Sequence, residues 1–221
     1  MLLDSKMIIL IGDATGHGVP SALITAAAQS CCSTLESIKK DHPDFELNPG
    51  MILSKLNNAI FRASRGTVKM TFFCGILDLD SGRFTYANAS HEMPLVCHAN
   101  QQDLDAPRSK KDIAVCTGKT GFILGNEAHS EYEEHEITLL PGESIVMYTD
   151  GLVECKNSEN QMYGKGRLLR NIFKNAQSDA QGIRDILIKD ASEYFGQRVR
   201  DDDVTLVVLK HKETPSLAQA V

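Results

Sequence analysis

Three acidic turns, each beside a predicted strand, are the parts of this chain whose residue types could do chemistry. The first is the glycine-rich turn 12–18, which follows an apolar run and places Asp13 at a strand end. The second places Asp150 directly after a β-prone run, and the third is the aspartate run 201–203, just before another. Carboxylate and carbonyl oxygens held in such turns suit a hard divalent cation such as Mg²⁺ or Mn²⁺.

Each turn also has an ordinary interpretation when it is taken alone. An aspartate before a glycine, as at Asp150, is common in turns, and a run of acidic residues is usually a solvated loop. Adjacent carboxylates raise one another's pKa values unless a cation neutralises them. Three carboxylate turns that each adjoin a strand favour an oxygen-rich site for two divalent ions, provided that the strand ends gather in space.

The order of these segments resembles that of a known family. The chain is similar to the bacterial PPM (PP2C-like) serine/threonine phosphatases, and within them to the SpoIIE and RsbU type. The resemblance extends from about residue 3 to residue 209. The segments that carry it are 12–18 (Gly-Asp-Ala-Thr-Gly-His-Gly), 88–95 (Asn-Ala-Ser-His-Glu-Met-Pro-Leu), 149–152 (Thr-Asp-Gly-Leu) and 202–206 (Asp-Asp-Val-Thr-Leu).

The resemblance implies roles for several residues of the acidic turns. The implied catalytic and metal-binding residues are Asp13, the Ala14 carbonyl, Asp150 and Asp202. Around these ligands the resemblance places Gly151, Asp203 and His17. His17 is the candidate general acid, because imidazole transfers protons near neutral pH, although a histidine between two glycines can equally be a hydrogen-bonded structural element.

The implied activity is that of a protein serine/threonine phosphatase that depends on Mn²⁺ or Mg²⁺, with two ions and a metal-activated water. In this type of phosphatase the substrate is a phosphorylated regulatory protein, an anti-sigma-factor antagonist. A sensor domain outside this chain would control it. The alternative hypothesis is a catalytically inactive phosphatase-like module that binds or regulates a partner in signalling.

The sequence departs from the family pattern at two places. The family carries a Gly-Gly-Asp motif on a strand upstream of the first acidic turn, and this chain begins with residues 2–6, which resemble the hairpin turn after that strand. We therefore expect an N-terminally incomplete domain whose sheet lacks one strand, with an uncovered edge that would allow a homodimer. Ser90 stands where the family has glycine, which affects only a local turn.

Composition limits the other classes of function. The net charge of −6 over 221 residues argues against a nucleic-acid partner. No apolar stretch approaches the ~20 residues of a membrane-spanning helix, so we expect no membrane insertion. The six cysteines are scattered and fit no zinc spacing, which favours free thiols in the reducing cytoplasm.

The pattern of apolar residues predicts a mixture of helices and strands of the α+β class. Helices are expected at 20–39, from Asn48 through Ile60, at 166–175 and at 180–195, and strands at 7–11, 71–79, 83–88, 95–98, 131–138, 144–147 and 204–209. The resemblance makes this an α-β-β-α sandwich of two antiparallel sheets flanked by helices. We expect one phosphatase domain over 1–211, with a polar loop at 99–120 and a flexible tail at 212–221.

Overall fold

A computed structural model describes residues 2–3, 5–98, 113–197 and 202–212 of the chain. Its residues fall into two compact units, each made from two separate stretches of sequence. Unit 1 comprises Met1–Glu92 and Thr117–Thr138, and unit 2 comprises Met93–Cys116 and Leu139–Val221. Each unit contains one antiparallel sheet and its own helices. The predicted single domain over 1–211 remains a prediction.

Unit 1 is built on an antiparallel sheet with the strand order β1-β2-β3-β4-β7. Its strands are β1 (Leu2–Leu3), β2 (Lys6–Ala14), β3 (Met70–Asp78), β4 (Arg83–Ala89) and β7 (His135–Thr138). The long β2–β3 ladder pairs Lys6 with Asp78 at one end and Asp13 with Thr71 near the other. The first acidic turn therefore follows directly from the best-paired strand of this sheet.

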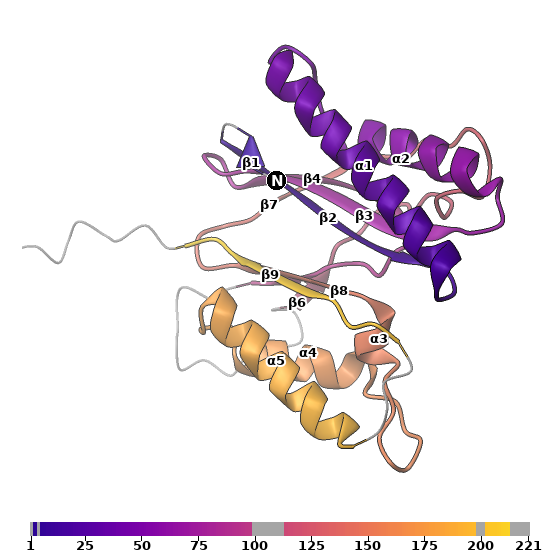
Figure 1. The fold of residues 1–221 in the computed structure, drawn as a ribbon. Coiled ribbons are helices and arrows are strands. Elements are labelled where there is room, and N and C mark those ends of the chain that lie inside the picture. The colour runs from indigo at the N-terminus through magenta and orange to yellow at the C-terminus, as the bar shows by residue number, and fades with distance from the viewer. Residues whose placement is uncertain (1, 4, 99–112, 198–201, 213–221) are drawn as a thin grey trace, which may run out of the picture. The chain divides into compact units, whose positions relative to one another are not determined.

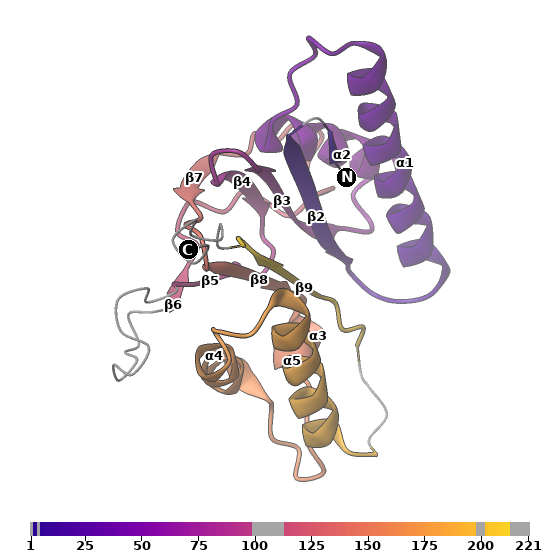
Figure 2. The same cartoon turned by 90° about the vertical axis from the view of Figure 1, so that its left-hand side faces the viewer.

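Two helices, α1 (Val19–Asp41) and α2 (Pro49–Ser64), cover one face of the unit 1 sheet (Figures 1 and 2). The α2 helix begins as predicted, with the Asn48 side chain accepting a hydrogen bond from the Met51 amide and Pro49 in the first turn. Four apolar residues of this helix form a stripe that is buried in the core of the unit: Ile52, Leu53, Leu56 and Ile60. This stripe is core, as expected for an amphipathic helix in a globular domain.

Unit 2 has a four-stranded antiparallel sheet with the order β6-β5-β8-β9. The strands are β5 (Leu95–Cys97), β6 (Ile113–Val115), β8 (Ser144–Tyr148) and β9 (Leu206–Lys210). The helices of this unit are α3 (Asp150–Val153), α4 (Gly164–Lys174) and α5 (Ala180–Phe195). Buried side chains of α4 and α5 join those of β5 and β8 in one apolar cluster. Figure 1 shows α4 and α5 side by side along one face of this sheet.

A polar cluster ties α4 to α5 at the surface of unit 2. The Asp190 carboxylate accepts hydrogen bonds from Arg167 Nε and Nη2, at 2.8 and 2.7 Å, from the Tyr163 hydroxyl at 2.8 Å and from Asn171 Nδ2 at 2.7 Å. The Arg167 guanidinium also lies over the rings of Tyr163 and Tyr194. The Arg167 guanidinium, despite partial burial of the carboxyl group, lowers the pKa of Asp190 to about 2.

Comparison with the sequence-based expectations confirms most elements and corrects several. The α5 limits are those predicted, and α1 extends slightly beyond 20–39 at both ends. The expected hairpin turn at 2–6 joins β1 to β2, so the sheet edge expected to be open carries a two-residue strand. Only the last four residues of 131–138 form a strand, and residues 113–115 of the expected polar loop pair as β6 with β5.

Two predicted segments cannot be compared with the structure. Residues 99–112 of the expected loop and residues 213–221 of the expected tail lie outside the described residues. Within the described part of the chain, no helix is both long enough and apolar enough to cross a membrane.

Candidate functional site

The first acidic turn leaves the end of β2 in unit 1. Asp13 and Ala14 are the last two residues of that strand and are both half-buried. The residue before them, Gly12, has no room for a side chain because the Phe72 ring fills the space beside it. A Cβ at this position would lie 2.3 Å from a ring carbon. The Thr15 amide extends the ladder by donating to the Lys69 carbonyl at 2.9 Å. Asp13 and Ala14 therefore stand on a rigid strand rather than on a loose loop.

A buried histidine, His91, is linked to Asp13 through Thr71. Thr71, the cross-strand partner of Asp13, places its hydroxyl 2.9 Å from His91 Nδ1 and 3.4 Å from the Asp13 carbonyl. The His91 backbone is held on both sides by the Asn88 side chain, at 2.7 and 2.9 Å. These contacts hold His91 in a fixed position within unit 1.

Ser90 has the left-handed conformation, with a φ of 57°. This conformation is costly for residues other than glycine, which explains why the family pattern has glycine there. Hydrogen bonds hold the residue in place: its amide donates to Thr120 Oγ1 and its hydroxyl to the Gly121 carbonyl, both at 2.9 Å. The departure at Ser90 is therefore accommodated locally, as the sequence analysis expected.

His17, the candidate acid, lies in the same turn between Gly16 and Gly18. His17 is exposed, and its ring forms no hydrogen bond with any of the described residues. A turn of this kind leaves the imidazole accessible to solvent. The structure therefore gives no hydrogen-bonded structural role to His17, and its role as an acid remains a prediction.

The second acidic turn lies in unit 2, where β8 passes into the short helix α3. Asp150 is the first residue of α3, a four-residue helix at a place where the sequence predicts a turn. The buried Thr149 hydroxyl donates to the Asp203 carbonyl at 3.2 Å and accepts from the Thr205 amide at 2.9 Å. Thr149 therefore joins the second acidic turn to the third.

Gly151 allows these two turns of unit 2 to touch. A Cβ on Gly151 would lie 2.3 Å from the Asp203 carbonyl oxygen and 3.4 Å from the Asp202 Cβ. Because backbone atoms cannot move aside as a flexible side chain can, a larger residue would push the turns apart. The glycine predicted beside the metal ligands thus has a defined task, which is to let Asp150 approach Asp202.

Asp150 and Asp202 form an arrangement that suits a divalent cation. A carboxylate oxygen of each lies within 4.8 Å of the other. Asp150 Oδ1 is buried and has no hydrogen-bond partner among the described residues, although buried polar atoms are normally paired. An unsatisfied carboxylate oxygen beside a second carboxylate is the donor chemistry that Mg²⁺ and Mn²⁺ prefer.

The remaining aspartate, Asp203, contributes through its backbone. Its amide donates to Asp202 Oδ1 at 2.8 Å, and its carbonyl accepts the Thr149 hydroxyl. It therefore orients Asp202, and the outer position of Asp203 around a metal ion stays a prediction. The structure brings together Asp150, Gly151, Asp202 and Asp203 within unit 2. Asp13, Ala14 and His17 belong to unit 1, and their participation in the same site stays a prediction.

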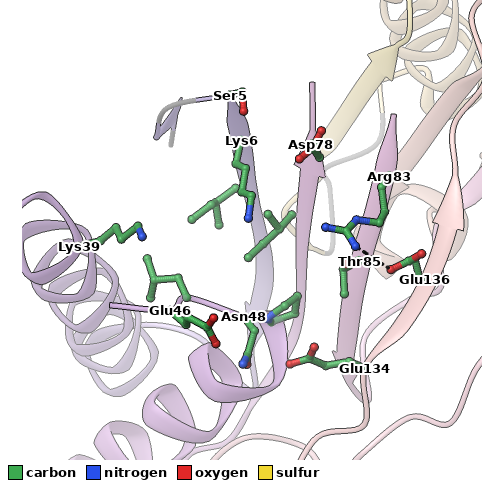
Figure 3. Close-up of a pocket in the computed structure, with 14 residues that line it drawn as sticks. Ser5, Lys6, Lys39, Glu46, Asn48, Asp78, Arg83, Thr85, Glu134 and Glu136 are labelled. Atoms are coloured by element: carbon green, nitrogen blue, oxygen red, sulfur yellow. Dashed lines mark ion pairs between the residues drawn. The ribbon is translucent and has the colours of Figure 1, made fainter. Parts of the chain in front are cut away.

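A groove of about 550 Å³ in unit 1 is not the site of this chemistry. It lies where β2 begins, at Lys6, and Asp13 lies seven residues further along the strand, or roughly 23 Å at about 3.3 Å per residue. Figure 3 shows charges of both signs around it, with Arg83 paired to Glu136 at 3.9 Å. The Glu134 carboxylate accepts a hydrogen bond from the Gly50 amide at 3.0 Å.

Comparison with known proteins assigns the chain to a family. The model of Stage II sporulation protein E (SpoIIE) matches residues 4–212. The chain belongs to the SpoIIE family. It is 28% identical over 208 residues to the phosphoserine phosphatase RsbU of Bacillus subtilis (strain 168), an alignment that covers 92% of this chain and 55% of RsbU. This SpoIIE-family chain therefore spans about half the length of that curated relative.

Solved structures show the fold of this SpoIIE-family chain. The SiaA-PP2C domain of Pseudomonas aeruginosa is similar with a TM-score of 0.72 and 19% identity, over 95% of this chain and 77% of that one. The PP2C phosphatase domain of SpoIIE from Bacillus subtilis, solved with a fragment of its regulatory domain, is similar with a TM-score of 0.66 and 18% identity. This match covers 95% of this chain and 56% of that one. The predicted α+β fold with two antiparallel sheets and flanking helices is confirmed.

Proposed function

We propose that this chain is a metal-dependent phosphatase that hydrolyses phosphoserine or phosphothreonine on a regulatory protein. The observation that carries the proposal is the pair of carboxylates in unit 2, where Asp150 Oδ1 is buried beside Asp202 and has no hydrogen-bond partner in the described part of the chain. Membership of the SpoIIE family and the likeness to RsbU, which is named a phosphoserine phosphatase, support this chemistry.

The proposed metal ligands are Asp150, Asp202, Asp13 and the Ala14 carbonyl. When bound, Mn²⁺ or Mg²⁺ would offset the charge of the phosphate ester and lower the pKa of water, and we propose two ions. Thr149 and the Asp203 backbone hold the unit 2 carboxylates in place. Oriented ligands of this kind matter, because loss of such an outer contact commonly costs about 10- to 100-fold in metal affinity.

His17 is the proposed proton donor to the seryl or threonyl oxygen that leaves. The exposed imidazole in the turn 12–18 is accessible to a protein substrate and belongs to the side-chain class suited to proton transfer near neutral pH. No side chain is assigned as a nucleophile, since hydrolysis by water needs none.

The biological setting belongs to the same proposal and rests on the family resemblance. We propose that the substrate is a phosphorylated anti-sigma-factor antagonist, that a sensor region controls the activity, and that the reaction takes place in the cytoplasm. A homodimer is also part of the proposal. The negative net charge is consistent with a protein partner rather than a nucleic acid.

The test is hydrolysis of para-nitrophenyl phosphate and of a phosphoserine peptide, with Mn²⁺ or with EDTA. We expect Mn²⁺-dependent turnover that Asp150→Asn lowers by at least about 100-fold, because a metal ligand is lost. Asp185→Asn is the matched control, since that carboxylate is exposed on α5 and forms an ion pair with its neighbour Arg184.

Two results would contradict the proposal. Full activity in folded Asp150→Asn would show that the carboxylate pair is not the site. A folded wild-type chain that binds Mn²⁺ and a phosphopeptide without turning it over would favour the non-catalytic binding module instead.

A further inference from the structure

We propose that Thr15 is a positioning residue that sets the metal affinity of the first acidic turn, by fixing the peptide group that carries the Ala14 carbonyl. The inference rests on the proposed function, in which the Ala14 carbonyl and the Asp13 carboxylate bind a divalent cation. Thr15 itself is not a proposed ligand and would act only through its neighbours.

The contact between Thr15 and Lys69 is made twice, by backbone and by side chain. The Thr15 amide donates to the Lys69 carbonyl at 2.9 Å, and the Thr15 hydroxyl donates to the same carbonyl at 3.1 Å. The hydroxyl also accepts from the Lys69 amide at 3.1 Å. One threonine thus satisfies both backbone groups of Lys69 and replaces a regular ladder pair just beyond the last residue of β2.

This contact determines the direction of the Ala14 carbonyl. A peptide bond is planar and trans, so the carbonyl of Ala14 points opposite to the amide hydrogen of Thr15. Because that amide points to Lys69, the Ala14 carbonyl is directed away from Lys69. The same plane limits the backbone rotation of Ala14, which in turn limits how the Asp13 carboxylate is presented.

Further contacts hold both partners in place. Ser21, in the first turn of α1, donates its hydroxyl to the Thr15 carbonyl at 3.1 Å. On the other side, Lys69 Nζ donates to Asn126 Oδ1 at 2.8 Å. Met70, the next residue, forms a bridge of two backbone hydrogen bonds with Leu124, at 2.9 and 3.1 Å. Thr15 is therefore held by hydrogen bonds to α1 on one side and to Lys69, the residue before β3, on the other.

Substitution of the hydroxyl separates this role from a general contribution to the fold. Thr15→Val keeps the shape and the backbone amide but removes both hydroxyl bonds, whereas Thr15→Ser keeps the hydroxyl. The matched control is Thr34→Val, since that hydroxyl donates a hydrogen bond to the Ser30 carbonyl within α1, away from the acidic turn. Asp13→Asn reports whether the turn binds the metal at all.

The measurement is the dissociation constant of Mn²⁺, followed by the electron paramagnetic resonance signal of the free ion, with thermal unfolding of each variant. We expect Thr15→Val to weaken binding about 10-fold, the magnitude typical of a lost outer contact, while Thr15→Ser stays within about threefold. Thr34→Val should match the wild type. Activity of Thr15→Val at saturating Mn²⁺ should return to near the wild-type level, because only the affinity is altered.

The outcomes are distinguishable. If Asp13→Asn weakens Mn²⁺ binding and Thr15→Val does not, the inference is wrong and the proposed function stands. Equal weakening by Thr15→Val and Thr15→Ser, or by Thr34→Val, also overturns the inference, because the hydroxyl contact would not be the cause. If Asp13→Asn binds Mn²⁺ normally, the proposed site fails and the role of Thr15 fails with it.

Discussion

The cluster around Asp190 offers a quantitative test of how α4 is held to α5. Asp190→Asn keeps the size of the side chain but removes the negative charge that Arg167 engages through two hydrogen bonds. The contacts from Tyr163 and Asn171 lose a charged acceptor at the same time. Hydrogen bonds to charged groups are stronger than those between neutral groups, so the variant should be less stable at neutral pH.

The magnitude follows from the pKa of the carboxyl group. Its fall from the ordinary value of 3.8 to about 2 corresponds to about 2 kcal/mol, since each pKa unit is worth about 1.4 kcal/mol. The Asp190 side chain is only 23% exposed, so solvent screening is limited. Because the folded-state pKa is lowered, this stabilisation is complete above about pH 5 and is lost as the pH falls through about 2.

The assay is urea unfolding at pH 7 and pH 3, followed by tyrosine fluorescence and circular dichroism. The chain has no tryptophan, and Tyr163 and Tyr194 of the cluster are two of its five tyrosines, so tyrosine emission follows unfolding of the chain with this region included. The wild type should exceed Asp190→Asn by about 2 kcal/mol in free energy of unfolding at pH 7, and by about half of that at pH 3.

The control is Asp185→Asn on the same helix. Its ion pair with Arg184 is exposed on both sides, and such pairs contribute about 0–1 kcal/mol. Equal losses in the two variants would refute the reasoning, as would a wild-type advantage over Asp190→Asn that does not change between pH 7 and pH 3.

Two further predictions concern the site and the start of α2. Gly151→Ala should lower Mn²⁺-dependent hydrolysis at least about 10-fold and the free energy of unfolding by about 1–3 kcal/mol, because its Cβ would meet the Asp203 carbonyl at 2.3 Å. Wild-type kinetics in this variant would mean that the two turns can separate without cost. Asn48→Ala should lower the free energy of unfolding in urea by about 1 kcal/mol, because the hydrogen bond from the Met51 amide to the N-cap side chain is lost. The affinity for Mn²⁺ should not change. Asn48→Ser should restore most of the lost stability.

Short-range signals explain which elements were predicted correctly from the sequence. The start of α5 follows from Asp179, whose side chain accepts a hydrogen bond from the Gly182 amide at 2.7 Å as an N-cap. The start of α2 follows from Asn48 and Pro49 in the same way. Both signals lie within one helical turn of the helix start that they mark, so they can be recognised in the sequence without knowledge of the fold.

Contacts set by strand register were beyond the reach of sequence reasoning. Thr71 is the cross-strand partner of Asp13, and Thr15 meets Lys69, but neither pairing is visible until β2 and β3 are aligned. The same holds for Arg167 and Asp190, which come from different helices. The predicted neighbours Asp150 and Asp202 were recognised because the family motif preserves their order, not because their spacing implies contact.

The interleaving of the two units along the chain constrains how the protein acquires its structure during synthesis. The sheet of unit 1 lacks its last strand until β7 has emerged and paired with β4, after the whole of β5 and β6. The sheet of unit 2 waits for β9, near residue 210. Such distant pairings favour slow folding and leave strand edges unpaired in the meantime. Nascent chains that have exposed only residues before 135 outside the ribosome should therefore engage chaperones more than chains that have also exposed β7 through residue 138.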